Sequence, residues 1–264
     1  MKEIIFFQGR FMPVSQARVS VLEATVLQAK GIFETMRAYQ GKIVYIQAHL
    51  KRLEKSSALL GIKLPYSLPQ LQSFIRQIIS LNRLADARLR LTLWQIGQRP
   101  ACLIVAERYH PYSTAKYKQG FSLYVSRFRQ SAGSFLAGIK TTSRLLYELA
   151  YAEAREQGCD EALLLNNRGY LCEASRSNLF FVQEGELFTP ALGCGCLDGI
   201  TRHVVFSLAK KQKIKLWEGN FIVSDLARAE EACLTNSLIG IMPLKDKCGK
   251  IIRLLQGRYN CLLG

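Results

Sequence analysis

Residues 110–120 show neither helical nor strand periodicity and include Pro111 and Gly120, in a chain that otherwise alternates between those two patterns. An aperiodic stretch with backbone-breaking residues is typical of a boundary between compact units. The length of 264 residues is enough for one large core or two smaller ones. We therefore predict a first domain at residues 1–110, a linker at 111–120 and a second domain at 121–264.

The first block combines apolar runs with two amphipathic segments. Apolar residues at helical spacing predict helices over residues 48–60 and 68–81. The expected strands are residues 4–11, 42–46, 87–94 and 101–106, with a hairpin turn at Gly97-Gln98-Arg99-Pro100.

The second block has shorter strands between two expected helices. The helices are residues 144–157, closed by Gly158, and a segment from near Thr201 to about Lys211. The expected strands are residues 121–127, 161–165, 179–183, 185–188 and 231–236. This succession predicts an α+β fold, with two domains and a cleft between them.

The composition limits the kinds of partner. The formal net charge is +16, but the lysines and arginines are scattered along the chain. Neither an RNA-binding signature, a zinc finger nor a basic tail accompanies them. We expect a basic surface and a pocket for a small anionic substrate, and no specific nucleic-acid partner.

Membrane and metal partners are not expected either. No apolar run approaches the length of a membrane span, and the first apolar stretch is too short for a signal peptide, so a cytoplasmic location is the default. The eight cysteines include no Cys-x-x-Cys pair, and there are three histidines. We therefore expect reduced thiols and no metal site.

Three groups along the second half of the chain suggest cofactor chemistry. Lys140 follows an apolar stretch and a glycine at the end of an apparent strand, where its amine either reaches solvent or becomes a desolvated nucleophile. Glu173 is either a turn acid or a partner for a cation. Gly199-Ile200-Thr201 opens a helix, whose first N–H groups can hold an anion. An amine, a carboxylate and an anion-binding turn are what a protein needs to hold pyridoxal phosphate.

The chain resembles the fold-type IV pyridoxal phosphate enzymes, which include branched-chain and D-amino-acid aminotransferases and aminodeoxychorismate lyase. The matching motifs are Gly31-Ile32-Phe33-Glu34-Thr35-Met36-Arg37, His49-Leu50-Lys51-Arg52-Leu53, Gly158-Cys159-Asp160-Glu161-Ala162, Glu173-Ala174-Ser175-Arg176-Ser177-Asn178 and Asp198-Gly199-Ile200-Thr201-Arg202. The resemblance implies a D-amino-acid-aminotransferase-like fold, with a small α/β domain and a larger pseudo-barrel domain, and a homodimer.

The resemblance also assigns roles. Lys140 would form the Schiff base with pyridoxal 5'-phosphate and then shuttle protons, and Glu173 would keep the pyridine nitrogen protonated. The groups that would hold the phosphate and the rest of the cofactor are Arg52, Ile200, Thr201, Asn236 and Ser237.

Finer similarities favour one reaction within the family. Arg144, four residues after Lys140, and the block around Phe33 and Thr35 resemble aminodeoxychorismate lyase segments. By that resemblance Thr35 would assist proton transfer, and Phe33, Arg90 and Arg144 would contact substrate.

The resulting hypothesis is a lyase that converts 4-amino-4-deoxychorismate to 4-aminobenzoate and pyruvate. Two alternatives stay open: an aminotransferase acting on branched-chain or D-amino acids, and a degenerate binding protein that kept the fold. The second rests on residues 22–31, which depart from the family's usual pattern at that point.

Overall fold

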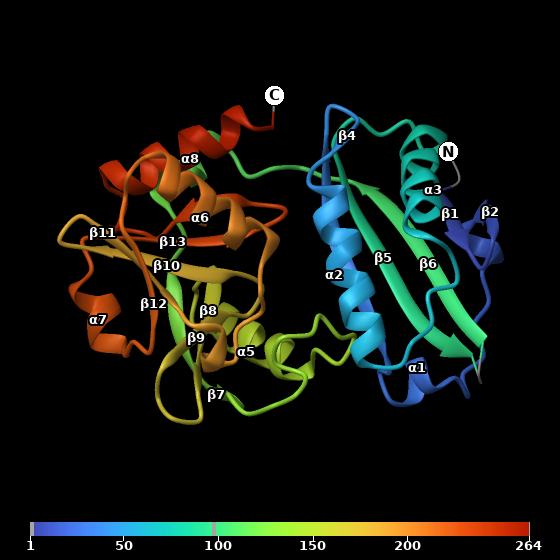
Figure 1. The fold of residues 1–264 in the computed structure, drawn as a ribbon, viewed down its shortest axis with the longest axis horizontal. Helices are drawn as coiled ribbons and strands as arrows, with labels where there is room; N and C mark the ends of the chain where they lie inside the picture. The colour runs from blue at the N-terminus through green and yellow to red at the C-terminus, as the bar shows by residue number, and fades with distance from the viewer. Residues whose placement is uncertain (1–2, 97–98, 264) are drawn as a thin grey trace. The chain divides into compact units, whose positions relative to one another are not determined.

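The computed structural model describes residues 3–96 and 99–263, which form two compact units (Figure 1). Unit 1 comprises Met1–His110 and Ile139–Ser143, and unit 2 comprises Pro111–Gly138 and Arg144–Gly264. Compared with the predicted ranges, residues 111–120 group with unit 2, and the short segment that contains Lys140 groups with unit 1. Helices and strands are mixed in both units, so the predicted α+β class is confirmed.

Unit 1 is built on a six-stranded antiparallel sheet in the order β2-β1-β6-β5-β3-β4. Its strands are β1 (Ile4–Phe7), β2 (Arg10–Pro13), β3 (Gly31–Tyr39), β4 (Lys42–Ile43), β5 (Ala87–Ile96) and β6 (Arg99–Arg108). A short 3-10 turn (Val14–Gln16) and the one-turn helix α1 (Ala24–Leu27) lie between β2 and β3.

Two helices cover one face of this sheet (Figure 1). They are α2 (Ile46–Leu59) and α3 (Leu68–Leu81), and their apolar sides bury Leu50, Leu53, Ile75 and Ile78 against the strands. Helix α3 starts with a capping box, in which the Ser67 side chain accepts from the Gln70 backbone and Gln70 bonds back to the Ser67 backbone. Strand alternation then decides which residues of β3 face the helices.

Unit 2 contains two sheets. A five-stranded sheet has the order β12-β11-β10-β13-β14, and a three-stranded sheet has the order β7-β8-β9. Their strands are β7 (Leu123–Gln130), β8 (Glu161–Asn166), β9 (Leu171–Ala174), β10 (Asn178–Gln183), β11 (Glu186–Pro190), β12 (Leu216–Gly219), β13 (Glu231–Asn236) and β14 (Gly240–Pro243).

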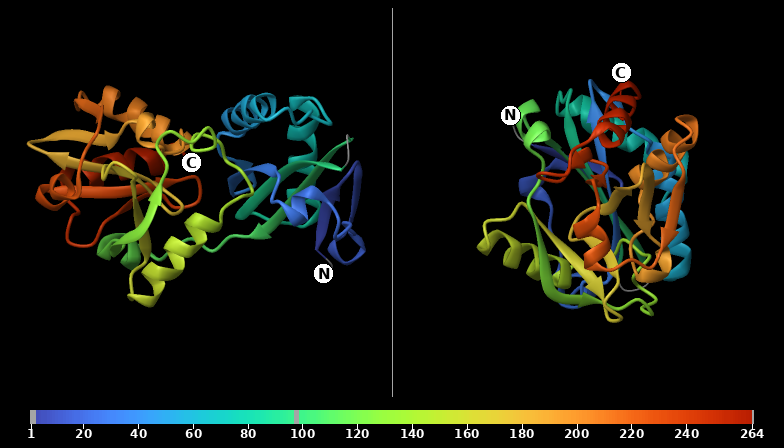
Figure 2. Two further views of the ribbon diagram at one scale, coloured as in Figure 1. Left: turned by 90° about the horizontal axis from the view of Figure 1, so that it is seen from below. Right: turned by 90° about the vertical axis from the view of Figure 1, so that its left-hand side faces the viewer.

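Helices pack on both sheets of unit 2 (Figures 1 and 2). Helix α5 (Leu145–Glu156) lies along β7 and β8, where Ala150 and Ala154 are buried. Helices α6 (Ile200–Lys211) and α8 (Lys250–Cys261) pack on β13. The remaining helices are α4 (Thr114–Gln119), a 3-10 turn (Leu192–Cys194) and α7 (Val223–Arg228).

Several element predictions need correction. The expected strand at residues 4–11 is a hairpin, because Gln8 and Gly9 take positive φ and turn the chain between β1 and β2. The expected strand at residues 42–46 stops at Ile43, and α2 begins at Ile46. Part of the expected turn, Gly97 and Gln98, lies outside the described residues, while Arg99 already belongs to β6.

Within residues 3–96 and 99–263, none of the helices combines the length and hydropathy that a membrane crossing requires.

We expect Gly120→Ala to lower the free energy of unfolding by more than about 2 kcal/mol, in urea titrations followed by circular dichroism. Gly120 has φ +80°, and a Cβ there would lie 2.6 Å from the Leu244 carbonyl carbon, which is backbone and cannot rotate away. Gly158→Ala is the matched control, because Gly158 also has positive φ (+69°) but meets nothing within 4 Å. The free energy of unfolding of Gly158→Ala should fall by only about 1 kcal/mol. Equal losses in the two variants would contradict the contact argument.

Candidate active site

Lys140 lies at the edge of β3 in unit 1. The Phe33 N–H donates to the Lys140 carbonyl at 2.9 Å, and the Thr142 N–H donates to the Gly31 carbonyl at 2.9 Å. Thr141 forms an isolated bridge with Ile32. The prediction that Lys140 ends a strand is therefore wrong: its segment makes one bridge only. The two backbone bonds nevertheless hold the lysine against the sheet.

The side chains of Lys140 and Arg90 meet on one phenyl ring. The Lys140 Nζ lies 4.7 Å from the centroid of the Phe33 ring, and the Arg90 guanidinium carbon lies 3.8 Å from it. Cations over an aromatic face are stabilised by the ring's negative quadrupole. The structure thus brings together three of the residues that the sequence singled out.

Thr35 belongs to the same face of the sheet. It pairs with Arg90 across the β3–β5 ladder, and Phe33 pairs with Thr92. Directly opposed residues of an antiparallel pair point to the same side, as do residues two apart on one strand. Thr35, Phe33 and Arg90 therefore share one surface, which is the side of β3 opposite to α2.

Arg52 is the remaining predicted residue of unit 1, and it is held by a carboxylate that the sequence analysis gave no role. Arg52 donates from Nε to Glu34 Oε1 at 2.8 Å and from Nη2 to Glu34 Oε2 at 2.7 Å. His49, one turn earlier on α2, lies 2.7 Å from the same Oε2 through Nδ1. A bidentate pair of this kind fixes the guanidinium plane.

Charge and burial determine the protonation of this cluster. Burial by itself would raise the pKa of the Glu34 carboxyl, but the Arg52 charge and the hydrogen bonds from Arg52 and His49 outweigh it and lower the pKa to about 2. Burial lowers the pKa of His49 and outweighs the opposing effect of Glu34. The cluster is therefore an ionised Glu34 with a charged Arg52 and a neutral His49 that donates through Nδ1–H.

Glu173 lies on β9 in unit 2 and is 5% exposed. Its Oε1 accepts from the Tyr147 hydroxyl at 2.9 Å, and its Oε2 accepts from the Leu197 N–H at 3.0 Å. Asn178 donates to Oε2 at 3.5 Å and to the Leu197 carbonyl at 2.8 Å. The buried carboxylate is therefore held at both oxygens by groups from α5 and from the loop before α6.

Arg144 contacts this network. Its guanidinium carbon lies 4.3 Å from the centroid of the Tyr147 ring, and its Nη2 donates to the Ser175 carbonyl at 2.5 Å. The sequence predicted Arg144 as a substrate contact, and that role stays a prediction.

The start of α6 has no side-chain cap. Gly199 is its N-cap and offers no side-chain cap, and a Cβ there would lie 2.0 Å from Asn178 Oδ1. Only glycine fits there, so no N-cap side chain accepts from the first N–H groups of the helix, which include those of Ile200 and Thr201. Such N–H groups can donate to an anionic ligand. Thr235, opposite Asn178 in the β10–β13 pair, has a buried hydroxyl with no partner among the described residues.

Asn236 and Ser237 lie where β13 turns towards β14. The Asn236 amide donates to Ser177 Oγ at 3.0 Å, and its Oδ1 accepts from the N–H groups of Leu238 and Ile239 at 2.8 and 3.0 Å. These bonds shape the turn that carries Ser237. The predicted contact of Asn236 with the cofactor would come in addition to these hydrogen bonds within the turn.

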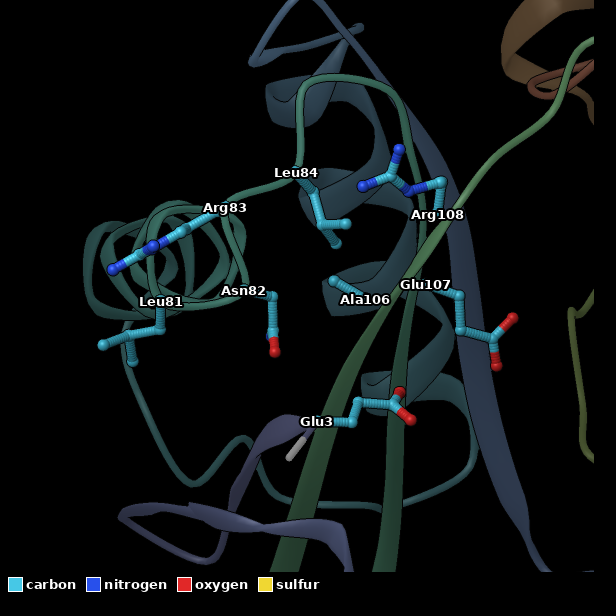
Figure 3. Close-up of a pocket in the computed structure, with 8 residues that line it drawn as sticks. All are labelled: Glu3, Leu81, Asn82, Arg83, Leu84, Ala106, Glu107 and Arg108. Atoms are coloured by element: carbon cyan, nitrogen blue, oxygen red, sulfur yellow. The ribbon is translucent and has the colours of Figure 1, made fainter. Parts of the chain in front are cut away.

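A separate pocket lies in unit 1, between the end of α3 and the end of β6 (Figure 3). None of the predicted site residues lines it. Asn82, which does, accepts from the Ile4 N–H at 2.8 Å and donates to the Ile4 carbonyl at 2.7 Å, so it ties β1 to α3. Its contacts are those of a structural residue.

Glu34, His49 and Tyr147 were missed as site residues by the sequence analysis. A carboxylate inside the apolar run of β3 was the available signal for Glu34, because a buried charge needs a partner. His49 and Arg52 share one face of α2 at i, i+3 spacing. Tyr147 gave no signal, since its partner lies on a strand in another part of the chain.

Comparisons with known proteins agree on one family. The family model for class IV amino-transferases matches residues 31–246. A probable branched-chain-amino-acid aminotransferase of Rickettsia bellii is 32% identical over 224 residues, which cover 81% of this chain and 76% of the relative. The aminodeoxychorismate lyase of Bacillus subtilis is 30% identical over 255 residues, covering 91% and 85%.

Among solved structures, the branched-chain aminotransferase of Thermoproteus uzoniensis, determined with norvaline, has a TM-score of 0.93 and 27% identity. The alignment covers 100% of this chain and 95% of that one.

We expect Glu34→Gln to lower the free energy of unfolding at neutral pH by about 3 kcal/mol, because the folded state holds the pKa of Glu34 well below its usual value. A depressed carboxyl pKa stabilises the fold above pH 4.5, and that stabilisation is lost as the pH falls towards 2. The difference in the free energy of unfolding between wild type and Glu34→Gln should therefore become smaller as the pH falls over this range. Urea titrations at a series of pH values measure it.

The matched control is Glu148→Gln, which removes a carboxylate from an exposed ion pair with Arg176. Its cost should stay below about 1 kcal/mol. A gap between Glu34→Gln and wild type that stays constant from pH 7 to 2 would refute the assignment.

Proposed function

The chain belongs to the class IV aminotransferase family, and on that premise we propose that it transfers amino groups from branched-chain amino acids to 2-oxo acids. The family uses pyridoxal 5'-phosphate, and the chain is an enzyme of that kind. Seven of the eight curated relatives compared are named as branched-chain aminotransferases, one of them only putatively and five as probable. Those names support aminotransfer over the lyase reaction that finer motif similarity favoured.

The residues present fit the cofactor in chemistry. Unit 1 offers an amine beside an aromatic ring and an oriented guanidinium. Unit 2 offers a buried carboxylate held at both oxygens and a helix start that is restricted to glycine. The observation that carries the proposal is Glu173: a 5% exposed carboxylate, held by hydrogen bonds at both oxygens, is suited to pair with a cationic ring nitrogen.

The cofactor, when bound, supplies an aldehyde and an electron-withdrawing ring. Lys140 would be the amine that attaches it, and the same Nζ would carry a proton from and back to the substrate's α-carbon. Glu173 would pair with the ring nitrogen. By the family resemblance, Arg52, the N–H groups of Ile200 and Thr201 and the Ser237 hydroxyl would hold the phosphate.

The substrate end of the reaction falls to the face of β3 and β5. Arg90 is the proposed partner of a substrate carboxylate, since a guanidinium binds that group in two-point fashion. Phe33 provides an apolar wall beside it. Glu34 lies on the other face of β3, where its carboxylate holds the Arg52 guanidinium in a fixed orientation. The role of Glu34 is therefore to position Arg52.

The lyase reaction remains the second candidate. The Bacillus subtilis relative carries that name, and it is similar to this chain over 91% of the sequence. In that case Thr35, on the same face as Phe33 and Arg90, would help a departing group to take up a proton.

We expect the purified protein, given pyridoxal 5'-phosphate, to convert L-leucine and 2-oxoglutarate to the corresponding oxo acid and glutamate, measured by liquid chromatography. Lys140→Ala should lower kcat by roughly 10²–10⁴-fold, because the proton carrier is lost. Lys118→Ala, an exposed lysine at the end of α4, is the control and should leave the rate unchanged.

In a parallel assay, the same purified protein is incubated with 4-amino-4-deoxychorismate. Release of 4-aminobenzoate and pyruvate without transfer from leucine would replace the proposed reaction by the lyase. A protein that never develops the visible absorbance of a lysine-bound cofactor would overturn both.

We also propose that the chain acts as a homodimer, as the family resemblance implies, and that it works in the cytoplasm. Equilibrium sedimentation should give about twice the chain mass of 29.8 kDa. A monomer that is fully active at all concentrations would contradict this.

A further inference from the structure

A relay of hydrogen bonds in unit 2 ends on Glu173. Gln130, the last residue of β7, donates from Nε2 to the Tyr147 hydroxyl oxygen at 2.8 Å. The Tyr147 hydroxyl lies 2.9 Å from Glu173 Oε1. The relay therefore runs from β7 through α5 to β9.

The direction of the relay follows from its chemistry. Gln130 Oε1 accepts from the Ser131 N–H at 3.2 Å, and its Nε2 also lies 3.4 Å from the Gly195 carbonyl, which places the amide nitrogen on the tyrosine side. The Tyr147 oxygen is thus an acceptor towards Gln130, and its single O–H proton is directed at Glu173. Burial, followed by the Glu173 charge, raises the pKa of Tyr147, so the phenol keeps this proton.

The tyrosine ring is held on a second side. The Arg144 guanidinium lies 4.3 Å from the ring centroid and is itself bonded to the Ser175 carbonyl at 2.5 Å. Tyr147 is consequently fixed at its hydroxyl by Gln130 and at its face by Arg144. A donor fixed in this way costs little further entropy when it bonds to the carboxylate.

We propose that Tyr147 is a positioning residue for the cofactor's ring nitrogen, acting through Glu173. By donating to Oε1 it holds the carboxylate in place and stabilises its anionic form, so that the proton shared between Glu173 and the pyridine nitrogen stays on nitrogen. This inference rests on the proposed function, because it assumes that Glu173 pairs with that nitrogen.

Tyr147 affects kcat through the position of the proton between Glu173 and the pyridine nitrogen. A carboxylate that loses a hydrogen-bond donor becomes more basic. The shared proton then moves towards Glu173, and a neutral pyridine withdraws electrons less well than a pyridinium. Loss of the Tyr147 hydroxyl should accordingly lower kcat and leave KM nearly unchanged, since no group that touches the substrate is removed.

The test compares Tyr147→Phe with Tyr151→Phe, which removes a hydroxyl one turn further along the same helix, where the ring packs on Arg176. With ¹⁵N-labelled pyridoxal 5'-phosphate, the ring-nitrogen resonance of Tyr147→Phe should move towards the value of an unprotonated pyridine. Its kcat should fall on the order of 10-fold, with KM within about 2-fold. Tyr151→Phe should match wild type in all three.

A second measurement needs no cofactor. In the apoprotein with ¹³C-labelled glutamate carboxyls, the titration midpoint of Glu173 should rise in Tyr147→Phe by about one pH unit or more. Replacing Tyr147 by 3,5-difluorotyrosine keeps the shape and strengthens the donor, so the midpoint should fall. This second variant also serves if Tyr147→Phe does not fold.

The outcomes separate the two proposals. A Glu173 midpoint that is the same in wild type and both Tyr147 variants overturns the inference, whatever the activity. A midpoint that shifts, in a protein that binds pyridoxal 5'-phosphate without any change of the ¹⁵N resonance, also overturns it. A wild-type protein that does not bind the cofactor at all overturns the proposed function and this inference with it.

Discussion

The alternation of side chains along β3 is the constraint that arranges the candidate site residues of unit 1. Each step along the strand sends the next side chain to the other face. Glu34 therefore points to α2, where it pairs with Arg52 and His49, while Phe33 and Thr35 point to the face that carries Arg90. A slip of one residue in the β3–β5 register would exchange these sets and bury Phe33 among the helices.

Two buried carboxylates are stabilised in different ways. Glu34 is matched by the guanidinium of Arg52, so its charge is compensated close at hand. Glu173 receives hydrogen bonds from neutral donors, which include the Tyr147 hydroxyl, the Leu197 N–H and the Asn178 amide. Neutral donors stabilise the ionised carboxylate but do not neutralise its charge. The carboxylate can therefore still attract a cationic ligand. The first arrangement suits a structural role, and the second suits binding.

Much of the fold follows from local pattern. The helix over residues 68–81 was predicted to the residue from apolar spacing alone, and the Ser67–Gln70 capping box and an early proline mark the same start in the structure. Strands β12 and β14 were missed because each has only four residues, too few to show alternation. The nine-residue strand β3 was missed as well, because it is buried on both faces and its sequence shows no clean alternation. The strand expected at Lys140 failed for another reason: its backbone bonds to β3, a distant part of the sequence.

The candidate site was predictable to a similar extent. Lys140, Glu173 and Arg52 carry motifs that a single sequence displays, and their local surroundings suit the chemistry proposed for them. Tyr147 could not be found in that way. Its importance comes from a hydrogen bond to a residue 26 positions away, and neither periodicity nor motif spacing records such a bond.

The return of residues 139–143 to unit 1 has a consequence for the order of synthesis. On a ribosome, β1 to β6 emerge well before this segment, so for a time the first part of β3 presents the Gly31 carbonyl and the Phe33 N–H as an open edge. Only when the chain has passed into unit 2 and come back do Lys140 and Thr142 close that edge. The nascent unit thus lacks these backbone partners of β3 until residues 139–143 arrive, and the segment that supplies them is the one that carries Lys140.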